Sequence, residues 1–190
     1  VKVTCEVGPH HLLLSEDDYD HLGNYARMNP PIRSRENIFA MWKGLKFEEI
    51  DIIATDHAPH TIEEKDQSYI KAPSGVPELD TLMPVMMNAV NDEGLTEAEV
   101  VKLCCEQPAE IFGIKNKGKL EAGYDADIVV VDMDLEKKVL REELQTKCGW
   151  SPYEGLKFKG WPVKVFVGGK LKFDAGKIIG NPEGQEVEFA

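Results

Sequence analysis

A short apolar segment at residues 50–54, interrupted only by Asp51, constrains the fold more than any other feature of this chain. Such a run is typical of a strand in a parallel sheet that is covered on both faces. Residues 1–8 predict a second buried strand, and residues 34–47 carry apolar side chains at helical spacing, with Ser34 placed to cap the helix. Together the three segments predict one strand–helix–strand unit, the repeating element of an α/β fold.

Three residues of catalytic type directly follow this run: Asp56, His57 and His60. In parallel α/β proteins the active site lies where strands end and loops begin. A carboxylate at that place can bind a divalent metal, transfer a proton, or do both, because its two oxygens can serve two partners. Burying a carboxylate at the mouth of a strand also costs free energy, unless nearby charges or hydrogen bonds compensate it. We therefore interpret Asp56 as a functional residue, against the alternative of an ordinary turn or helix-capping aspartate.

Several further residues are suited to bind a polar ligand. His60 lies on a loop and can contact a substrate carboxylate or carbonyl, with a plain surface histidine as the alternative. Asn29 lies in a stiff Pro-Pro loop and offers both a donor and an acceptor, which suits an amide or imide. Ser74 and Gly75 can present backbone groups, since glycine permits close approach. His57 is expected to point away from the carboxylate that precedes it, and its role stays open.

Glu6, His10 and His11 form a second polar group near the start of the chain. Adjacent histidines on a strand would face opposite ways, so at most one of the two would reach a shared site. Packing or support of other residues is favoured over metal binding for this group. The four cysteines contain no C-x-x-C pair, and we interpret them as packing residues in a reduced, cytoplasmic compartment.

Charge and hydropathy exclude several classes of partner. The formal net charge of −12 and the isoelectric point near 4.9 argue against nucleic acid or an anionic membrane surface. No apolar run approaches the roughly 20 residues needed to cross a bilayer, and no signal peptide is evident. The chain begins with Val1 on a strand-like pattern, so we expect a cut made inside a longer polypeptide.

The segments around the strand–helix–strand unit give further predictions. Residues 12–25 predict an irregular connection, and residues 61–77 predict a polar loop that acts as a lid or binding loop. A helix is predicted over residues 77–90, with Pro84 able to kink it. Another helix is predicted over residues 96–106, because it opens on a Thr-x-x-Glu capping box.

From about residue 118 the sequence changes to a turn-rich and strand-rich pattern. Residues 128–131 predict a four-residue strand core, and residues 161–173 predict a hairpin across two adjacent glycines. We therefore place a domain boundary near residue 115, with an α/β part over residues 1–115 and a small β-rich module over residues 116–190.

Taken together, these motifs resemble the C-terminal half of the dihydroorotases, in the cyclic amidohydrolase branch of the amidohydrolase superfamily. The resemblance covers almost the whole chain, and its motifs follow one another in the family's order. The matching motifs lie at residues 5–12, 29–33, 54–60, 72–75, 118–132 and 151–155.

The resemblance implies a fold and a metal centre. The fold is the C-terminal portion of a (β/α)8 TIM-type barrel, about its last two strands, over residues 1–115, followed by a small β-sandwich-type module. The family binds two zinc ions, and Asp56 matches its metal-ligating aspartate, which also carries the proton to the leaving nitrogen. The other ligands would lie upstream of Val1, so the fragment alone is expected to be inactive. The family's substrate contacts match Asn29, His60, Ser74 and Gly75.

The activity implied by the resemblance is the reversible conversion between dihydroorotate and N-carbamoyl-aspartate, a step of de novo pyrimidine synthesis. A hydantoinase, dihydropyrimidinase or allantoinase is the nearest enzymatic alternative, and His60 favours the dihydroorotase because a substrate carboxylate needs a donor there. A non-catalytic dihydroorotase-like subunit that scaffolds aspartate carbamoyltransferase is a further alternative. The implied partners are a small-molecule substrate and either a second copy of the chain or aspartate carbamoyltransferase.

Overall fold

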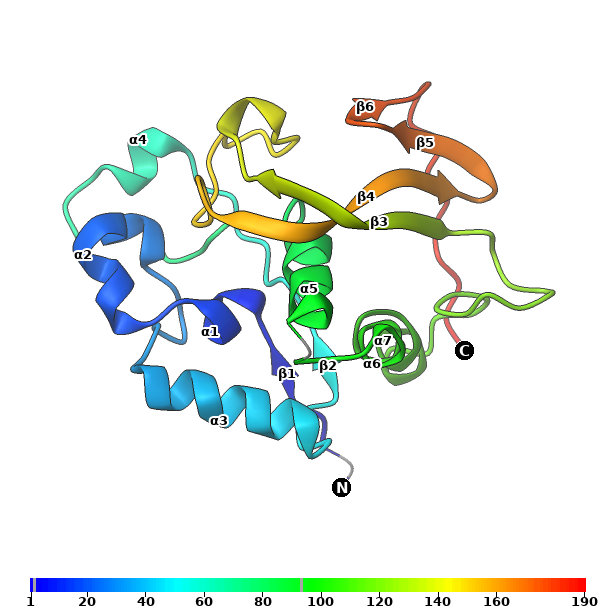
Figure 1. Cartoon of the computed structure of the whole chain (residues 1–190), viewed down its shortest axis with the longest axis horizontal. Helices are drawn as coiled ribbons and strands as arrows, with labels where there is room; N and C mark the ends of the chain where they lie inside the picture. The colour runs from blue at the N-terminus through cyan, green and yellow to red at the C-terminus, as the bar shows by residue number, and fades with distance from the viewer. Residues whose placement is uncertain (2, 93) are drawn as a thin grey trace. The chain divides into compact units, whose positions relative to one another are not determined.

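The computed structural model describes residues 1, 3–92 and 94–190 (Figure 1). The chain forms two compact units that interleave along the sequence. The first unit contains Val1–Val85 and Lys138–Lys157, and the second contains Met86–Lys137 and Phe158–Ala190. The two units are defined by which residues pack together, whereas the predicted boundary near residue 115 separates two consecutive parts of the sequence. That boundary stays a prediction.

The predicted strand–helix–strand unit is confirmed in the first unit. Strand β1 (Glu6–Val7) pairs in parallel with β2 (Ile52–Ile53), and Figure 1 shows the two strands side by side. Helix α3 (Arg35–Lys46) connects them, as its apolar spacing predicts. The prediction of a buried strand over the first eight residues was too long, because Val1 and Val3 are exposed. Only the two residues that pair with β2 are in strand conformation.

The segment after β1 is helical, so the prediction of an irregular connection was wrong. Pro9 starts the first helix, where a proline costs nothing because the first amide of a helix has no partner. Asp18 then accepts a hydrogen bond from the Ser15 backbone N–H at 2.7 Å and starts the next turn. The elements are α1 (Pro9–Leu13), η1 (Glu16–Asp18), α2 (Tyr19–Leu22) and η2 (Gly23–Ala26).

The polar segment after β2 contains one short helix, α4 (Ile62–Lys65). A capping box holds its start, since the Thr61 N–H donates to the Glu64 carboxylate at 2.8 Å. The following helix, α5 (Leu82–Asn91), begins later than predicted. Pro84 therefore lies in its first turn, where the missing N–H breaks no helical hydrogen bond.

The helix predicted over residues 96–106 is confirmed and continues directly into a further short helix. Together they comprise α6 (Glu97–Val101), a π-helical segment η3 (Lys102–Glu106) and α7 (Gln107–Ile111), and the Thr96 capping box is confirmed. Pro108 explains the wide π turn, because a proline ring clashes with the carbonyl four residues before it in a regular α-helix.

A four-stranded sheet follows, with the order β3-β4-β5-β6. Its strands are β3 (Ile128–Lys138), β4 (Lys157–Val167), β5 (Lys170–Asp174) and β6 (Lys177–Ile178). The predicted hairpin is confirmed: β4 and β5 are antiparallel and joined by two glycines with positive φ. These strands form a β-rich module, and a sandwich-type arrangement of residues 116–190 stays a prediction.

None of the helices in the described part of the chain combines the length and the apolar character that crossing a bilayer requires.

Candidate functional site

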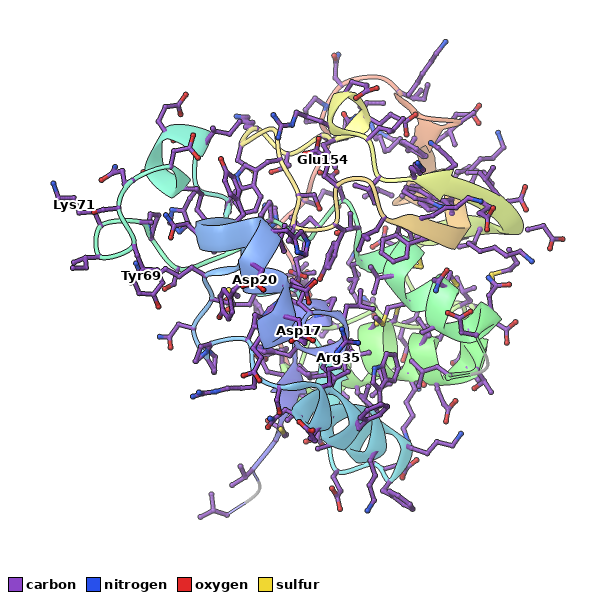
Figure 2. All side chains as sticks on the ribbon, turned by 60° about the vertical axis from the view of Figure 1, so that its left-hand side comes forward. Asp17, Asp20, Arg35, Tyr69, Lys71 and Glu154 are labelled. Atoms are coloured by element: carbon purple, nitrogen blue, oxygen red, sulfur yellow. The ribbon has the colours of Figure 1, made fainter. Side chains whose placement is uncertain are left out.

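A cleft of about 430 Å³ lies at the carboxyl ends of β1 and β2. We call it the strand-end cleft. Residues from both strand ends line it, together with the Pro30-Pro31 loop and the first half of α3. This is the position at which parallel sheets place active sites, because the loops that follow neighbouring strands meet there. Arg35, which follows the cleft-lining Ser34, forms an exposed ion pair with Asp17 at 2.8 Å, and the two are neighbours in Figure 2.

Asp56 lines this cleft, as its position after β2 predicts. Its side chain is exposed, so the expectation of a carboxylate in a buried strand mouth was wrong. The loop turns outward at this residue, because its φ of +46° lies in the left-handed region. That conformation is uncommon for residues other than glycine and tends to occur at functional sites, where the surrounding structure enforces it. Asp56 is therefore a strained, solvent-accessible carboxylate in a cleft.

His10 lies on α1, not on a strand, which corrects the expectation that it and His11 point to opposite faces of a strand. Its Nδ1 is 2.8 Å from a carboxylate oxygen of Glu78, and the hydroxyl of Tyr153 donates to the other oxygen. All three side chains are almost completely buried. Burial, helped by the charge of Glu78, raises the pKa of Tyr153 well above its usual value, so the phenol stays a donor.

His11 connects the buried hydrogen-bonded residues His10, Glu78 and Tyr153 to the strand-end cleft. Its ring centroid is 4.1 Å from that of His10, and its Nε2–H donates to the Pro30 carbonyl at 3.0 Å. Burial is the main cause that lowers the pKa of His11, with a contribution from His10, against raising effects of the Pro30 bond and Asp56. The ring therefore favours its neutral form. Glu6 also lines the cleft and is exposed.

A second polar cluster brings together three of the predicted substrate contacts. The Nε2–H of His60 donates to the Ser74 carbonyl at 3.0 Å. Gly75 follows directly, and a Cβ there would lie only 2.5 Å from the Cβ of Ala58, so the close approach requires glycine. Asn29 is exposed and precedes the prolines that line the strand-end cleft.

His57 has a structural connection that the sequence left open. Its Nδ1 accepts hydrogen bonds from the backbone N–H groups of Glu78 and Leu79, at 3.0 and 3.2 Å. It therefore ties the end of β2 to the segment that carries the buried carboxylate. Sequence reasoning missed Glu78, Lys65 and Trp150. Only the motif at residues 151–155, next to Trp150, pointed to this region.

The zinc centre implied by the resemblance needs several protein ligands. The described residues contain no group of three or more His, Cys, Asp or Glu side chains placed to hold a metal ion. The exposed carboxylate of Asp56 is suited to supply one ligand, but these residues by themselves do not fit a binuclear centre.

Comparisons with known proteins identify the family. The model of the amidohydrolase family matches residues 3–172. A dihydroorotase of Halobacterium salinarum is 41% identical over 92% of this chain and 41% of its own length. A dihydroorotase of Methanosarcina mazei is 46% identical over 80% of this chain and 34% of its own length. The chain thus spans well under half of these relatives.

The solved structures agree with this assignment. The L-hydantoinase (dihydropyrimidinase) of Arthrobacter aurescens matches 93% of this chain and 40% of its own, with a TM-score of 0.89 and 34% identity. The structural match implies a TIM-barrel-type fold, and the chain itself shows the α/β portion described above. Because the family match extends over residues 3–172, this chain belongs to the amidohydrolase family.

Proposed function

We propose that this chain is part of a dihydroorotase, which interconverts dihydroorotate and N-carbamoyl-aspartate with the help of zinc, in pyrimidine biosynthesis. The observation that carries the proposal is Asp56, a strained and exposed carboxylate in a cleft at the ends of parallel strands. The dihydroorotases with 41% and 46% identity support the choice of reaction. A hydrolase of this class needs a carboxylate that can reach both a metal and a transferable proton.

Each part of the chain has a role in the proposed enzyme. Asp56 supplies one metal ligand and moves the proton between the attacking water and the ring nitrogen. A bound zinc ion would make that water nucleophilic near neutral pH. The other metal ligands come from polypeptide outside this sequence, as the described residues hold no group of three and the relatives are much longer.

The cluster around His60 binds the substrate in this proposal. His60 contacts the substrate carboxylate through Nδ1, which is a donor in the doubly protonated ring, because its Nε2–H is bonded to the Ser74 carbonyl. The backbone at Ser74 and Gly75 meets the polar edge of the substrate ring. Asn29 contacts the ring as donor and acceptor. A cytoplasmic location, self-association and an association with aspartate carbamoyltransferase stay predictions.

Steady-state assays of the complete enzyme test the proposal. We expect turnover of dihydroorotate, and we expect Asp56→Asn to lower it at least ~100-fold. Circular dichroism and metal analysis of the variant separate loss of proton transfer from loss of folding or of bound zinc. Asp20→Asn is the matched control, since Asp20 is also exposed and lies on α2 (Figure 2). Equal activity of both variants would overturn the role of Asp56.

A hydantoinase is the second candidate, because the structural match with 34% identity bears that name. Parallel rates on dihydroorotate, hydantoin and allantoin separate the two. A preference for hydantoin would reject the dihydroorotase and retain the family.

A further inference from the structure

Lys65 is the most unusual buried group of the first unit. It ends the short helix α4, where its neighbours Glu63 and Glu64 are exposed, yet its own side chain has no solvent exposure. Lysine is almost never fully buried unless its charge is compensated. The arrangement of groups around its ammonium therefore needs an explanation.

Three backbone carbonyls surround the ammonium group. The Nζ of Lys65 donates to the carbonyls of Pro73 and Gly75, at 3.0 Å each, and to that of Arg27 at 3.4 Å. An ammonium has three N–H donors, so this set satisfies all of them. The dipoles of these carbonyls stabilise the buried ammonium, and the group keeps its positive charge.

These carbonyls belong to the segments that carry the predicted substrate contacts. Pro73 and Gly75 lie on either side of Ser74, and Arg27 lies two residues before Asn29. The Gly75 N–H also donates to the Arg27 carbonyl at 2.9 Å, which joins the two segments directly. A single side chain thus fixes both segments, because it bonds to each of them.

Trp150 closes the cluster and connects it to His60. Its ring centroid is 5.5 Å from the Lys65 ammonium, within the range of a cation–π interaction. Its indole N–H donates to the His60 carbonyl at 2.7 Å. The Tyr25 ring meets the indole edge-on at 4.9 Å, which fixes the plane of the ring. The backbone of His60 is therefore held by the residue that covers Lys65.

We propose that Lys65 is a positioning residue of the substrate site: its ammonium group holds the backbone of the Asn29 and Ser74–Gly75 segments, and with Trp150 that of His60, in the geometry that binds substrate. The inference rests on the proposed function, since it concerns how the same site is organised.

The energetics fit a positioning role better than a stabilising one. Desolvation lowers the pKa of Lys65 from 10.5 to about 8, and the like charge of Arg27 adds to this effect. The nearby carboxylates bind elsewhere: Glu64 accepts from the Thr61 N–H, and Asp66 accepts from the Tyr25 hydroxyl. A buried ammonium without a carboxylate partner is costly to the fold, so its benefit lies in the placement of the carbonyls.

Substitution of Lys65 by methionine in the complete enzyme tests the proposal. Methionine keeps an unbranched apolar side chain and removes the three donors. We expect KM for dihydroorotate to rise at least ~10-fold with kcat within about threefold, because binding geometry is lost and the reacting groups remain. Lys71→Met is the matched control, because Lys71 is an exposed lysine of the same segment (Figure 2). A Lys65→Met enzyme with the KM of this control would overturn the proposal.

Hydrogen exchange gives a readout that does not need activity. We expect the Gly75 amide and the Trp150 indole hydrogen to exchange at least ~10-fold faster in Lys65→Met than in Lys71→Met. Unchanged exchange at both positions would overturn the proposal. If the wild-type enzyme does not turn over dihydroorotate, the proposed function fails, while the exchange result still decides whether Lys65 organises these segments.

The pH dependence of the wild-type enzyme tests the same idea if Lys65→Met does not fold. The ammonium is present below its pKa of about 8 and is lost as the pH rises through that value. We expect KM to be constant below this range and to rise above it, because a neutral amine has one donor fewer. The stability of the fold should rise over the same range, since the unfolded chain binds this proton more tightly. A KM that is flat across this range would contradict the role of Lys65.

Discussion

The two units of this chain differ in how many polar side chains they bury. Every buried polar or charged side chain among the described residues belongs to the first unit, and the set is His10, Ser15, Lys65, Glu78, Thr81 and Ser151. In the second unit, charged side chains form ion pairs that keep contact with solvent, such as Lys117 with Asp125 and Asp127, or Lys164 with Asp174. Both units are parts of one polypeptide chain.

The difference indicates where precise geometry is needed. A buried polar group is costly unless every partner is in place, so a network of such groups permits only one arrangement of the backbone. The first unit contains such networks next to Asp56 and His60, the residues that we propose to contact metal and substrate. An exposed ion pair contributes little to stability and does not require an exact position. We therefore expect the second unit to tolerate changes of its charged side chains better than the first.

The largest effect is expected from Glu78→Ala in the first unit. The substitution removes the buried carboxylate that is bonded to Nδ1 of His10 and to the hydroxyl of Tyr153, and we expect the free energy of unfolding to fall by about 3 kcal/mol. Urea unfolding followed by circular dichroism measures the change. The backbone N–H of Glu78 still donates to His57, so the result isolates the side chain.

Tyr153→Phe is the matched control for this network, because it removes one hydroxyl and keeps the ring. We expect a loss of about 1.5 kcal/mol. If Glu78→Ala costs no more than Tyr153→Phe, the network does not act as a unit and the contrast between the two units is lost.

An effect smaller than that of Glu78→Ala is expected from Gly160→Ala in the second unit. Gly160 has a φ of +99°, and a Cβ there would lie 2.5 Å from the Cβ of Met87. We expect a loss of about 2 kcal/mol from backbone strain and overpacking, measured by thermal unfolding. Gly168→Ala is the control, because its Cβ would meet no atom within 4 Å and only the positive φ remains. Equal losses would show that packing at this position is not tight.

The smallest effect is expected from Lys117→Met. Lys117 is paired with Asp125 at 3.0 Å and with Asp127, and both carboxylates are partly exposed. These bonds raise the pKa of Lys117, but solvent screens them. We expect less than ~1 kcal/mol of destabilisation, and less still in about 1 M NaCl. A loss as large as that of Glu78→Ala would reverse the comparison between the units.

Local patterns in the sequence were enough to predict those helices and strands that form because of residues close together in the chain. The spacing of apolar residues predicted α3, the apolar run predicted β2, the Thr96 capping box predicted α6, and the paired glycines predicted the β4–β5 hairpin. The position of Asp56 directly after a buried strand also indicated the cleft. Each of these signals depends on periodicity or turn chemistry, which the sequence shows directly.

Only the tertiary structure decided how the site is held. Glu78 meets His10 across 68 residues and Tyr153 across 75, and Trp150 meets His60 across 90. Within its own helix Lys65 looks like an ordinary surface lysine, and it is buried because carbonyls 8, 10 and 38 residues away surround its ammonium and Trp150 covers it. The exposure and positive φ of Asp56 likewise depend on the path of the surrounding loop. The sequence by itself determined the segments and the candidate residues, while long-range hydrogen bonds, which no local pattern encodes, decided their geometry.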